Sequence, residues 1–480
     1  MLQVRILVTI FFSLGFSFGI NLPLVASQIG RVCVQDLNRE ISSLLNTPER
    51  QKESWGVVVE RLDNRQNLYQ LNPNKYFIPA SNVKLFTTAA ILLKEGENFA
   101  IKTPIYLKTE SEKTTLLIWG KGDPTISKLQ LNIIANKLLQ KGLKHLDELI
   151  LVDDSNFAHN AVNHTWEFSD LFFSYSVPVN SLILGGNSVI LTIKPSNPGE
   201  KVRIQWSDEI AGRQWQIINE GVTVKEGEEY TLDVHPFQLE PVLVIRGNLP
   251  VSQGEDNWFL SIPKPAEYFR DSLISILSAK GIIVDRVTIN STAQLDLKGY
   301  DLLLEFQSPP LKELIRKTNQ DSNNLYGEVL FKYVAKNYKN PRDSLEEILE
   351  EIGINKENYQ LKDGSGLSRQ NLVTPKSIVD LLAAMANSKY GDLFRESLAV
   401  SGISGTLKNR LREPMAGKVV GKTGTLTGVA ALSGYLHPQN YKDLVFSIIV
   451  NNSLEKSSDL RAIIDQIVVL LYKLEDCRSP

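Results

Sequence analysis

The pattern of apolar and polar positions divides the chain into parts of different texture. Residues 55–71 contain two apolar runs around the turn-rich sequence DNRQN, which predicts a β-hairpin. An apolar helix is predicted next, from about Ser81 to Lys94, and Gly96 ends it. From about 105 to 300 the pattern changes to short strands with few helical stretches, and 190–250 is nearly all strand and turn.

Helical periodicity returns after about residue 310. Predicted helices lie in 309–337, 343–353, 374–391 and 457–477, and strand-like runs lie in 428–438 and 442–452. Helices and strands at both ends of the chain therefore enclose a β-rich middle. This order predicts an α/β protein of the α+β type, with the middle segment inserted into a surrounding domain.

The first 27 residues have the features of a secretory signal peptide. Arg5 precedes a mostly apolar stretch that ends at Ile20, and Val25 and Ser27 are small residues at positions −3 and −1 of a cleavage site. The alternative is an uncleaved N-terminal anchor, which the short apolar stretch disfavours. We therefore expect an exported, periplasmic or otherwise extracytoplasmic protein with no stable membrane span after cleavage.

Composition and charge exclude several classes of protein. A net charge of −2 disfavours a nucleic-acid partner, because such proteins usually carry a basic surface. The five histidines are scattered, so no metal site is predicted. The only Gly-x-Ser-x-Gly match lies inside the leader, at 15–19, which disfavours a Ser-His-Asp hydrolase. No nucleotide-binding loop is found, and no cofactor is expected.

Ser81 and Lys84 form the first candidate pair for catalysis. Positions i and i+3 share one face of a helix, so both side chains are expected to point the same way. A serine needs a base to become a nucleophile, and a lysine can be that base when burial lowers its pKa. The alternative is a helix cap at Ser81 with a solvated Lys84, and the pair alone favours this alternative.

Two further polar groups follow in the chain. Ser322 and Asn324 stand two apart at the head of an apolar helix, where a capping sequence is the alternative. Lys422-Thr423-Gly424-Thr425 lies beside strand-like sequence, where a surface turn is the alternative. An exposed strand edge could pair with an extended peptide there, and Lys422 could attract a carboxylate.

Taken in order, Ser-x-x-Lys, Ser-x-Asn and Lys-Thr-Gly are the signature of penicillin-recognising enzymes. The long separation of the first two motifs resembles the low-molecular-mass class C penicillin-binding proteins, the D-alanyl-D-alanine carboxypeptidase/endopeptidase family. Further stretches resembling this family lie at 120–125, 151–157, 175–182, 363–369 and 405–410. Lys121 interrupts the glycines that the family has in the first of these stretches.

The resemblance implies an architecture. A penicillin-binding, transpeptidase-like domain with an antiparallel sheet flanked by helices would comprise 28–104 and 300–480. Two β-rich inserted domains would comprise 105–190 with 250–299, and 191–249. Because the terminal helices of this family pack together, a disulfide between Cys33 and Cys477 would be feasible, although the family does not require one.

The resemblance also implies roles at the reacting centre. Ser81 would be the acylated nucleophile, Lys84 its base, and Ser322 a relay of the proton to the leaving group. Asn324 would hold the substrate amide. Lys422 would lower the local pKa values.

Substrate binding would use the last motif and two more distant residues. Lys422 with Thr423 and Thr425 would hold the terminal carboxylate, and the backbone N–H groups of Ser81 and Thr425 would form the oxyanion hole. Asp170 would contact the amine of the stem-peptide side chain, and Arg369 its carboxylate.

The sequence thus predicts a serine-type D-Ala-D-Ala carboxypeptidase and leaves open whether the protein is also a D,D-endopeptidase. Its partners would be peptidoglycan stem peptides as substrates and β-lactam antibiotics as inhibitors. One alternative is a β-lactamase, although no glutamate can be placed as a deacylating base. The other is a catalytically silent cell-wall scaffold, which the intact motifs disfavour.

Overall fold

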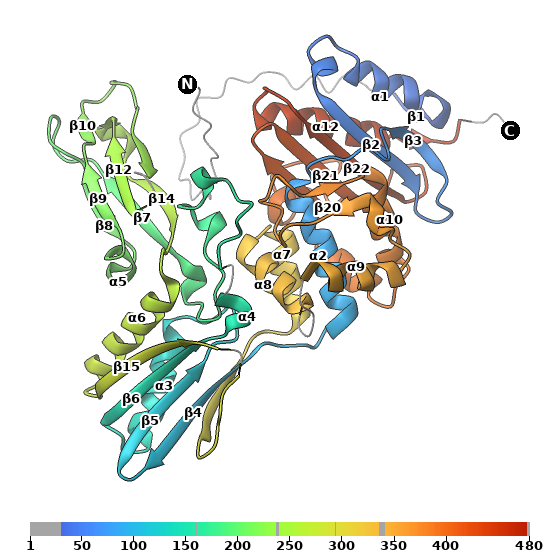
Figure 1. Ribbon diagram of the computed structural model, residues 1–480. Coiled ribbons are helices and arrows are strands. Elements are labelled where there is room, and N and C mark those ends of the chain that lie inside the picture. Colours follow the sequence, from blue (N-terminus) through green and yellow to red (C-terminus); the bar gives the residue numbers. More distant parts are fainter. Residues whose placement is uncertain (1–29, 159–160, 237–239, 293, 336–340, 478–480) are drawn as a thin grey trace.

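A six-stranded antiparallel sheet forms the centre of the larger lobe in Figure 1. The computed structural model describes residues 30–158, 161–236, 240–292, 294–335 and 341–477; the predicted leader lies outside them. The strands of the six-stranded sheet, in spatial order, are β19 (Ala399–Val400), β20 (Val419–Leu426), β21 (Val429–Leu436), β22 (Leu444–Asn451), β2 (Ser54–Arg61) and β3 (Asn67–Leu71). All residues of β21 and β22 are buried, which explains why these strands read as apolar runs.

Helices cover both faces of this sheet. On one face, α1 (Leu37–Leu45) and α12 (Ser457–Tyr472) contribute to a single apolar core with the strands. The strand β1 (Val32–Cys33) pairs in parallel with β23 (Leu474–Glu475), and a disulfide joins Cys33 to Cys477 beside them. The two ends of the described chain are therefore fastened together on this face (Figure 1).

The opposite face of the sheet carries the helices that surround the candidate site. They share a second apolar core, with α2 running through its middle. These helices are α2 (Val83–Glu95), α7 (Leu311–Gln320), α8 (Asn324–Val334), α9 (Pro341–Glu351), α10 (Pro375–Ala386) and α11 (Gly391–Glu396).

A second sheet of five strands forms the lower lobe in Figure 1. Its spatial order is β15 (Ile283–Ser291), β6 (His145–Asp153), β5 (Lys113–Trp119), β4 (Lys102–Glu110) and β16 (Asp301–Gln307). The helices α3 (Lys128–Gln140) and α6 (Pro265–Ala279) share the apolar core of this lobe. A Ser127 cap and Gln130 close a capping box at the start of α3.

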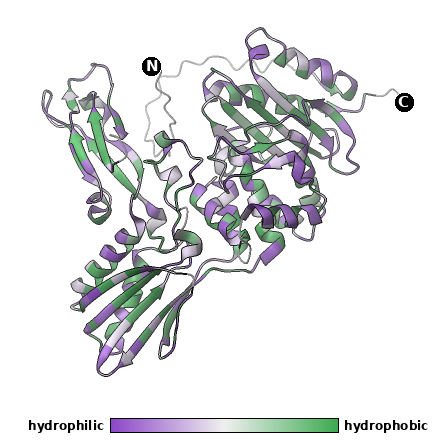
Figure 2. Cartoon of the chain, viewed as in Figure 1, coloured by the Kyte–Doolittle hydropathy of each residue, from purple (hydrophilic) through white to green (hydrophobic). Residues whose placement is uncertain are grey.

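Short strands form the third, smallest part of the molecule. They make up two three-stranded sheets and one two-stranded sheet. The strands are β7 (Ser188–Lys194), β8 (Arg203–Trp206), β9 (Gln216–Asn219), β10 (Val222–Val224), β11 (Asp233–Pro236), β12 (Val242–Arg246), β13 (Asn248–Pro250) and β14 (Asp256–Ser261). Hydrophobic residues occur both in the strands and in the helices of the lobes (Figure 2). None of the described helices has the length and apolar character needed to cross a membrane.

The observed elements extend beyond the predicted limits of the inserted segments. β4 begins at Lys102 and β16 ends at Gln307, because β16 pairs with β4 and completes the second sheet. The smallest part extends from Ser188 to Ser261, because β14 pairs with β7. The division into three domains stays a prediction, and the strands show where its limits need widening.

The helix predicted from about Ser81 to Lys94 begins later in the structure. Ala80–Asn82 form a 3-10 turn, and α2 begins only at Val83. Ala80 has a φ of 49°, so the backbone turns sharply just before the helix. Ser81 therefore lies in the turn, one residue outside the helix cap Asn82. The α-helices and strands not named above are α4 (Ser155–Ala158), α5 (Glu209–Gly212), β17 (Tyr359–Gln360) and β18 (Leu372–Val373).

Candidate active site

Two glycine-containing segments pack closely against the turn that carries Ser81. A Cβ atom on Gly424 of β20 would lie 2.6 Å from the Pro79 carbonyl oxygen. A Cβ atom on Gly366 would lie 1.9 Å from the Ala80 carbonyl oxygen, and its φ of +87° also favours glycine. The strand and the loop can approach Ser81 this closely only because both positions lack a side chain.

Lys84 lies at the centre of the site and is fully buried. Its Nζ is 3.0 Å from Ser81 Oγ, 2.6 Å from Asn324 Oδ1 and 2.5 Å from the Ser365 carbonyl oxygen. The Asn324 side chain is oriented by its own Nδ2, which donates to the Tyr175 carbonyl oxygen at 2.7 Å. The structure thus brings Asn324 next to Ser81 and Lys84, although it lies 240 positions beyond Lys84 in the sequence.

These three contacts determine the hydrogen bonds that a neutral Lys84 amine would make. The Asn324 Oδ1 and the Ser365 carbonyl oxygen can only accept hydrogen bonds. A neutral amine has two N–H groups, and both are taken by these acceptors. Its lone pair is then left for Ser81 Oγ, so the serine hydroxyl becomes the donor. This is the arrangement in which Lys84 can remove the serine proton.

Burial also makes the neutral form accessible. Desolvation lowers the pKa of Lys84 to about 7, although the charges of Asp363 and Glu328 oppose this shift. Desolvation and the nearby Lys84 charge hold the pKa of Lys422 well below its ordinary value.

The second half of the site joins the two remaining motifs. Lys422 Nζ is 2.8 Å from Ser322 Oγ and 2.9 Å from the Thr423 carbonyl oxygen. Ser322 connects α7 and α8 with a φ of 58°, a conformation that non-glycine residues seldom adopt. Thr423 Oγ1 donates to Thr406 Oγ1 at 2.8 Å, so Thr406 orients this hydroxyl.

Asp170 and Arg369 sit on the segments that border this centre. Tyr175 donates its hydroxyl to Asp170 Oδ1 at 3.0 Å, and burial raises the pKa of Asp170. Arg369 Nε lies 2.9 Å from Glu167 Oε1, and its Nη2 donates to the Thr427 carbonyl oxygen at 3.0 Å. The Arg369 charge acts on Asp170, so both belong to one neighbourhood, but their roles stay a prediction.

Sequence reasoning missed the buried carboxylate of Glu328 beside Lys84. Glu328 is 5% exposed and accepts the N–H groups of Gly364 and Ser365, at 3.0 and 2.8 Å. Burial, with the nearby Asp363 charge, raises the pKa of Glu328 to about 7. Glu328 lies four residues after Asn324, so helical spacing from the Ser-x-Asn motif was the available signal. By holding the Ser365 backbone, Glu328 fixes the carbonyl that binds Lys84.

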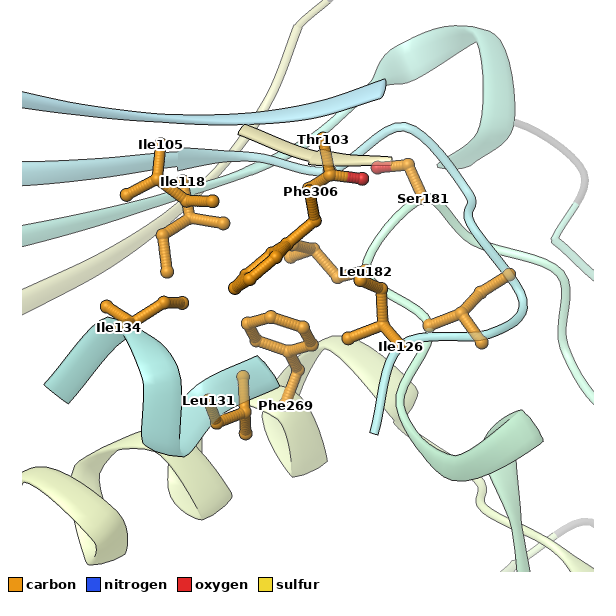
Figure 3. A pocket seen from close by; sticks show the side chains of 12 residues that line it. Thr103, Ile105, Ile118, Ile126, Leu131, Ile134, Ser181, Leu182, Phe269 and Phe306 are labelled. Carbon is orange, nitrogen blue, oxygen red and sulfur yellow. The ribbon is translucent and has the colours of Figure 1, made fainter. Parts of the chain in front are cut away.

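Two cavities lie outside this site and are lined by none of the motif residues. A cavity of about 10 Å³ lies among side chains of β4, β5, β16, α3 and α6, which point toward one another in Figure 3. It has room for about one water molecule. A wider cavity of about 460 Å³ between Arg213, Lys264 and Glu267 has mixed charges and none of the motif residues.

Among the residues that the structure describes, one group has three candidate metal ligands close together. His145, Asp147 and Asp285 place ligand atoms within 4.8 Å of one another. They lie on β6 and β15 of the second sheet, and His145 and Asp285 are exposed. None of them belongs to the three motifs, so the site described above does not involve this group.

Comparison with known proteins identifies the family. The model of the D-Ala-D-Ala carboxypeptidase 3 (S13) family matches residues 37–474. This chain belongs to that family. The penicillin-sensitive carboxypeptidase A of Dictyostelium discoideum is 30% identical, with 92% of each chain covered. A D-alanyl-D-alanine carboxypeptidase of Actinomadura is 28% identical, with 93% of this chain and 86% of the relative covered.

The fold agrees with this assignment. The crystal structure of penicillin-binding protein 4 from Haemophilus influenzae superposes with a TM-score of 0.77 at 24% identity. The match covers 90% of this chain and 99% of the other. The expected penicillin-binding fold with a mixed α/β architecture is therefore confirmed.

The pKa of Lys84 predicts how acylation depends on pH. Lys84 can act as a base only when neutral, and its pKa is about 7, so the acylation rate should rise through pH 7 and then level off. The Glu328 carboxylate raises the pKa of Lys84. Glu328→Gln removes this negative charge, so the rising limb should move to lower pH. The loop should keep its position, because the amide oxygen can still accept the Gly364 and Ser365 N–H groups.

The measurement is the rate of acylation by a chromogenic β-lactam between pH 5 and 9. Glu60→Gln is a matched control, because Glu60 is also a buried carboxylate but lies on β2, three strands away from β20. An unchanged or raised midpoint in Glu328→Gln would contradict the electrostatic coupling of Glu328 to Lys84.

Proposed function

We propose that this chain is a serine-type D-Ala-D-Ala carboxypeptidase that also opens D-Ala–diamino acid cross-links of peptidoglycan. One observation carries the proposal. Two obligate acceptors bind the buried Lys84 amine and leave its lone pair for Ser81 Oγ, 3.0 Å away. This geometry supports an activated serine nucleophile.

In the proposed reaction, Ser81 Oγ attacks the carbonyl carbon of the penultimate D-alanine while Lys84 takes the hydroxyl proton. The backbone N–H groups of Ser81 and Thr425 would stabilise the oxyanion. When the C–N bond breaks, the proton that Lys84 took from Ser81 would pass through Ser322 to the leaving amine, and Lys84 would become neutral again. Lys422 contacts Ser322 at 2.8 Å. Water would then attack the acyl-enzyme and return free Ser81 and the shortened peptide.

Substrate recognition would use groups on both sides of Ser81. Asn324 would hold the peptide amide, and Lys422, Thr423 and Thr425 would hold the terminal carboxylate. The partly buried Asp170 would accept the ammonium of the diamino-acid side chain, and Arg369 would bind its carboxylate. A cation beside Asp170 would keep it ionised despite its raised pKa.

The proposed site of action is extracytoplasmic, where peptidoglycan lies, and residues 1–27 would direct export. β-Lactams would acylate Ser81 as substrate mimics. In support, penicillin-binding protein 4 of Haemophilus influenzae has been solved in complex with a β-lactam. No cofactor or nucleic-acid partner is required.

Release of D-alanine tests the proposed function. The purified protein is incubated with an N-acetylated peptide that ends in D-Ala-D-Ala, and free D-alanine is measured over time. The same peptide ending in L-Ala-L-Ala is the matched control. We expect catalytic release from the first peptide alone. Rapid hydrolysis of benzylpenicillin without peptide turnover would instead indicate a β-lactamase, and neither reaction would indicate a silent scaffold.

A further inference from the structure

The inserted segment that carries Asp170 is fastened to the loop that carries Arg369. Asn163 Nδ2 donates to the Lys362 carbonyl oxygen at 2.8 Å. Thr165 Oγ1 donates to Ser368 Oγ at 2.7 Å. The two segments come from different parts of the chain, one after β6 and the other after β17.

The third link is an indole–carboxylate hydrogen bond at the centre of this contact. Trp166 Nε1 donates to Asp363 Oδ2 at 2.9 Å, and Asp363 is fully buried. Asp363 also receives the N–H groups of Gly366 and Ser368 and the Nδ2 of Asn371, at 2.7, 2.6 and 2.9 Å. Four donors thus surround one carboxylate. Hydrogen bonds to a charged group are stronger than neutral ones, so this carboxylate holds its surroundings in a defined arrangement.

The links determine where the two pocket residues lie. Asp170 follows Trp166 by four residues and is held by Tyr175, whose carbonyl oxygen accepts from Asn324. Arg369 directly follows Ser368, which Asp363 binds through its backbone N–H. A shift of the Trp166 segment relative to the Asp363 loop would therefore change the spacing between Asp170 and Arg369. Ser81 and Lys84 belong to neither segment. The loop binds Lys84 through the Ser365 carbonyl oxygen, and Glu328 holds that part of the loop through the Ser365 N–H, so this contact does not depend on the Trp166 hydrogen bond.

We propose that Asp363 and Trp166 are positioning residues that set the spacing of Asp170 and Arg369 and so determine selectivity for a diamino-acid side chain. The inference rests on the proposed function of this site. Asp363 and Trp166 touch no substrate in this scheme. They act through the pocket residues by holding the inserted segment against the catalytic loop.

The test uses Trp166→Phe, which removes the indole N–H but keeps an aromatic ring. Two peptides ending in D-Ala-D-Ala are compared. One has a third residue whose side chain bears an ammonium and a carboxylate, and the other has alanine there. We expect kcat/KM for the first peptide to fall about tenfold, through KM, as befits the loss of one hydrogen bond to a charged group. For the alanine peptide and for acylation by benzylpenicillin, we expect changes below about twofold.

Matched variants separate this effect from general destabilisation. Trp55→Phe loses a similar bond, from Trp55 Nε1 to Glu53 Oε2 at 2.8 Å, but lies on β2 away from the pocket, and should leave both peptides unchanged. Thr165→Val removes the hydroxyl that binds Ser368 and should reproduce the selective loss. In an Asp170→Asn background, Trp166→Phe should have little further effect on the first peptide, because the residue it positions has already been altered.

The inference would be overturned if kcat/KM fell equally for both peptides, or if Trp166→Phe or Thr165→Val caused no fall for the first peptide. The proposed function would remain intact in either case. Full additivity of Trp166→Phe with Asp170→Asn would also overturn the inference. A wild-type protein that hydrolyses neither peptide would overturn the proposed function, and the inference with it.

Discussion

Replacing Lys84 with methionine is expected to lower the rate constant for acylation by benzylpenicillin by about 10²–10⁴-fold, the range for loss of a general base. Lys84 is fully buried, and methionine fills a similar volume without placing a polar atom there. The variant would lose the one amine within reach of Ser81 Oγ that the described hydrogen bonds provide. Stopped-flow or quenched acylation measurements would give the rate constant.

Lys94→Met provides the matched control for this variant. Lys94 lies on the same helix and also donates to a carbonyl oxygen, that of Val334 at 2.6 Å. It stands ten residues beyond Lys84, and so about 15 Å along the helix. Its replacement should leave acylation nearly unchanged. An acylation rate in Lys84→Met close to that of the wild type would show that another group deprotonates Ser81.

Lys422→Met is expected to lower kcat/KM for a D-Ala-D-Ala peptide by about 10²–10³-fold, the range for removing one preorganised electrostatic contact. Two functions would be lost together: the contact with Ser322 and the cation for the terminal carboxylate. The pKa of Lys422 is lowered in the free protein, and a bound carboxylate would favour its charged form.

A peptide amidated at its C-terminus separates these two functions, because it lacks the carboxylate. The wild type should strongly prefer the free acid, and Lys422→Met should lose most of that preference. If the preference survived, the carboxylate would have to be bound by other residues, such as Arg369 or Thr423.

The sequence allowed the principal site residues to be predicted because three spaced motifs occur in a fixed order. Ser81, Lys84 and Asn324 indeed meet through hydrogen bonds, as do Ser322 and Lys422. The spacing of residues within each motif is local and can be read directly. Their meeting depends on tertiary structure, which entered only through the family resemblance.

No role was predicted for Glu328 or for Asp363, although Asp363 begins one of the stretches that resemble the family, and the reason is physical. Glu328 accepts two backbone N–H groups of the loop 363–368, and two of the four donors to Asp363 are also backbone N–H groups of this loop. Backbone donors leave no trace in the sequence, and a buried carboxylate cannot be told from an exposed one by its letter. The link from Trp166 to Asp363 joins residues 197 positions apart, which no local pattern can indicate.

The limits of the elements were also less predictable than their kinds. β16 was overlooked because its sequence DLLLEFQ carries little alternation, and only its pairing with β4 identifies it as a strand. The 3-10 turn at Ser81 was read as helix, since local propensity does not distinguish the two over three residues.

Intact-mass measurement with benzylpenicillin directly tests whether Ser81 is the acylated nucleophile. The mature protein and a Ser81→Ala variant are incubated with the antibiotic, and the adduct is located by peptide mapping. We expect a lasting mass increase of one penicilloyl group on the wild type alone, on the peptide that contains Ser81. An adduct of equal yield on Ser81→Ala, or one mapped to a different residue, would contradict this expectation.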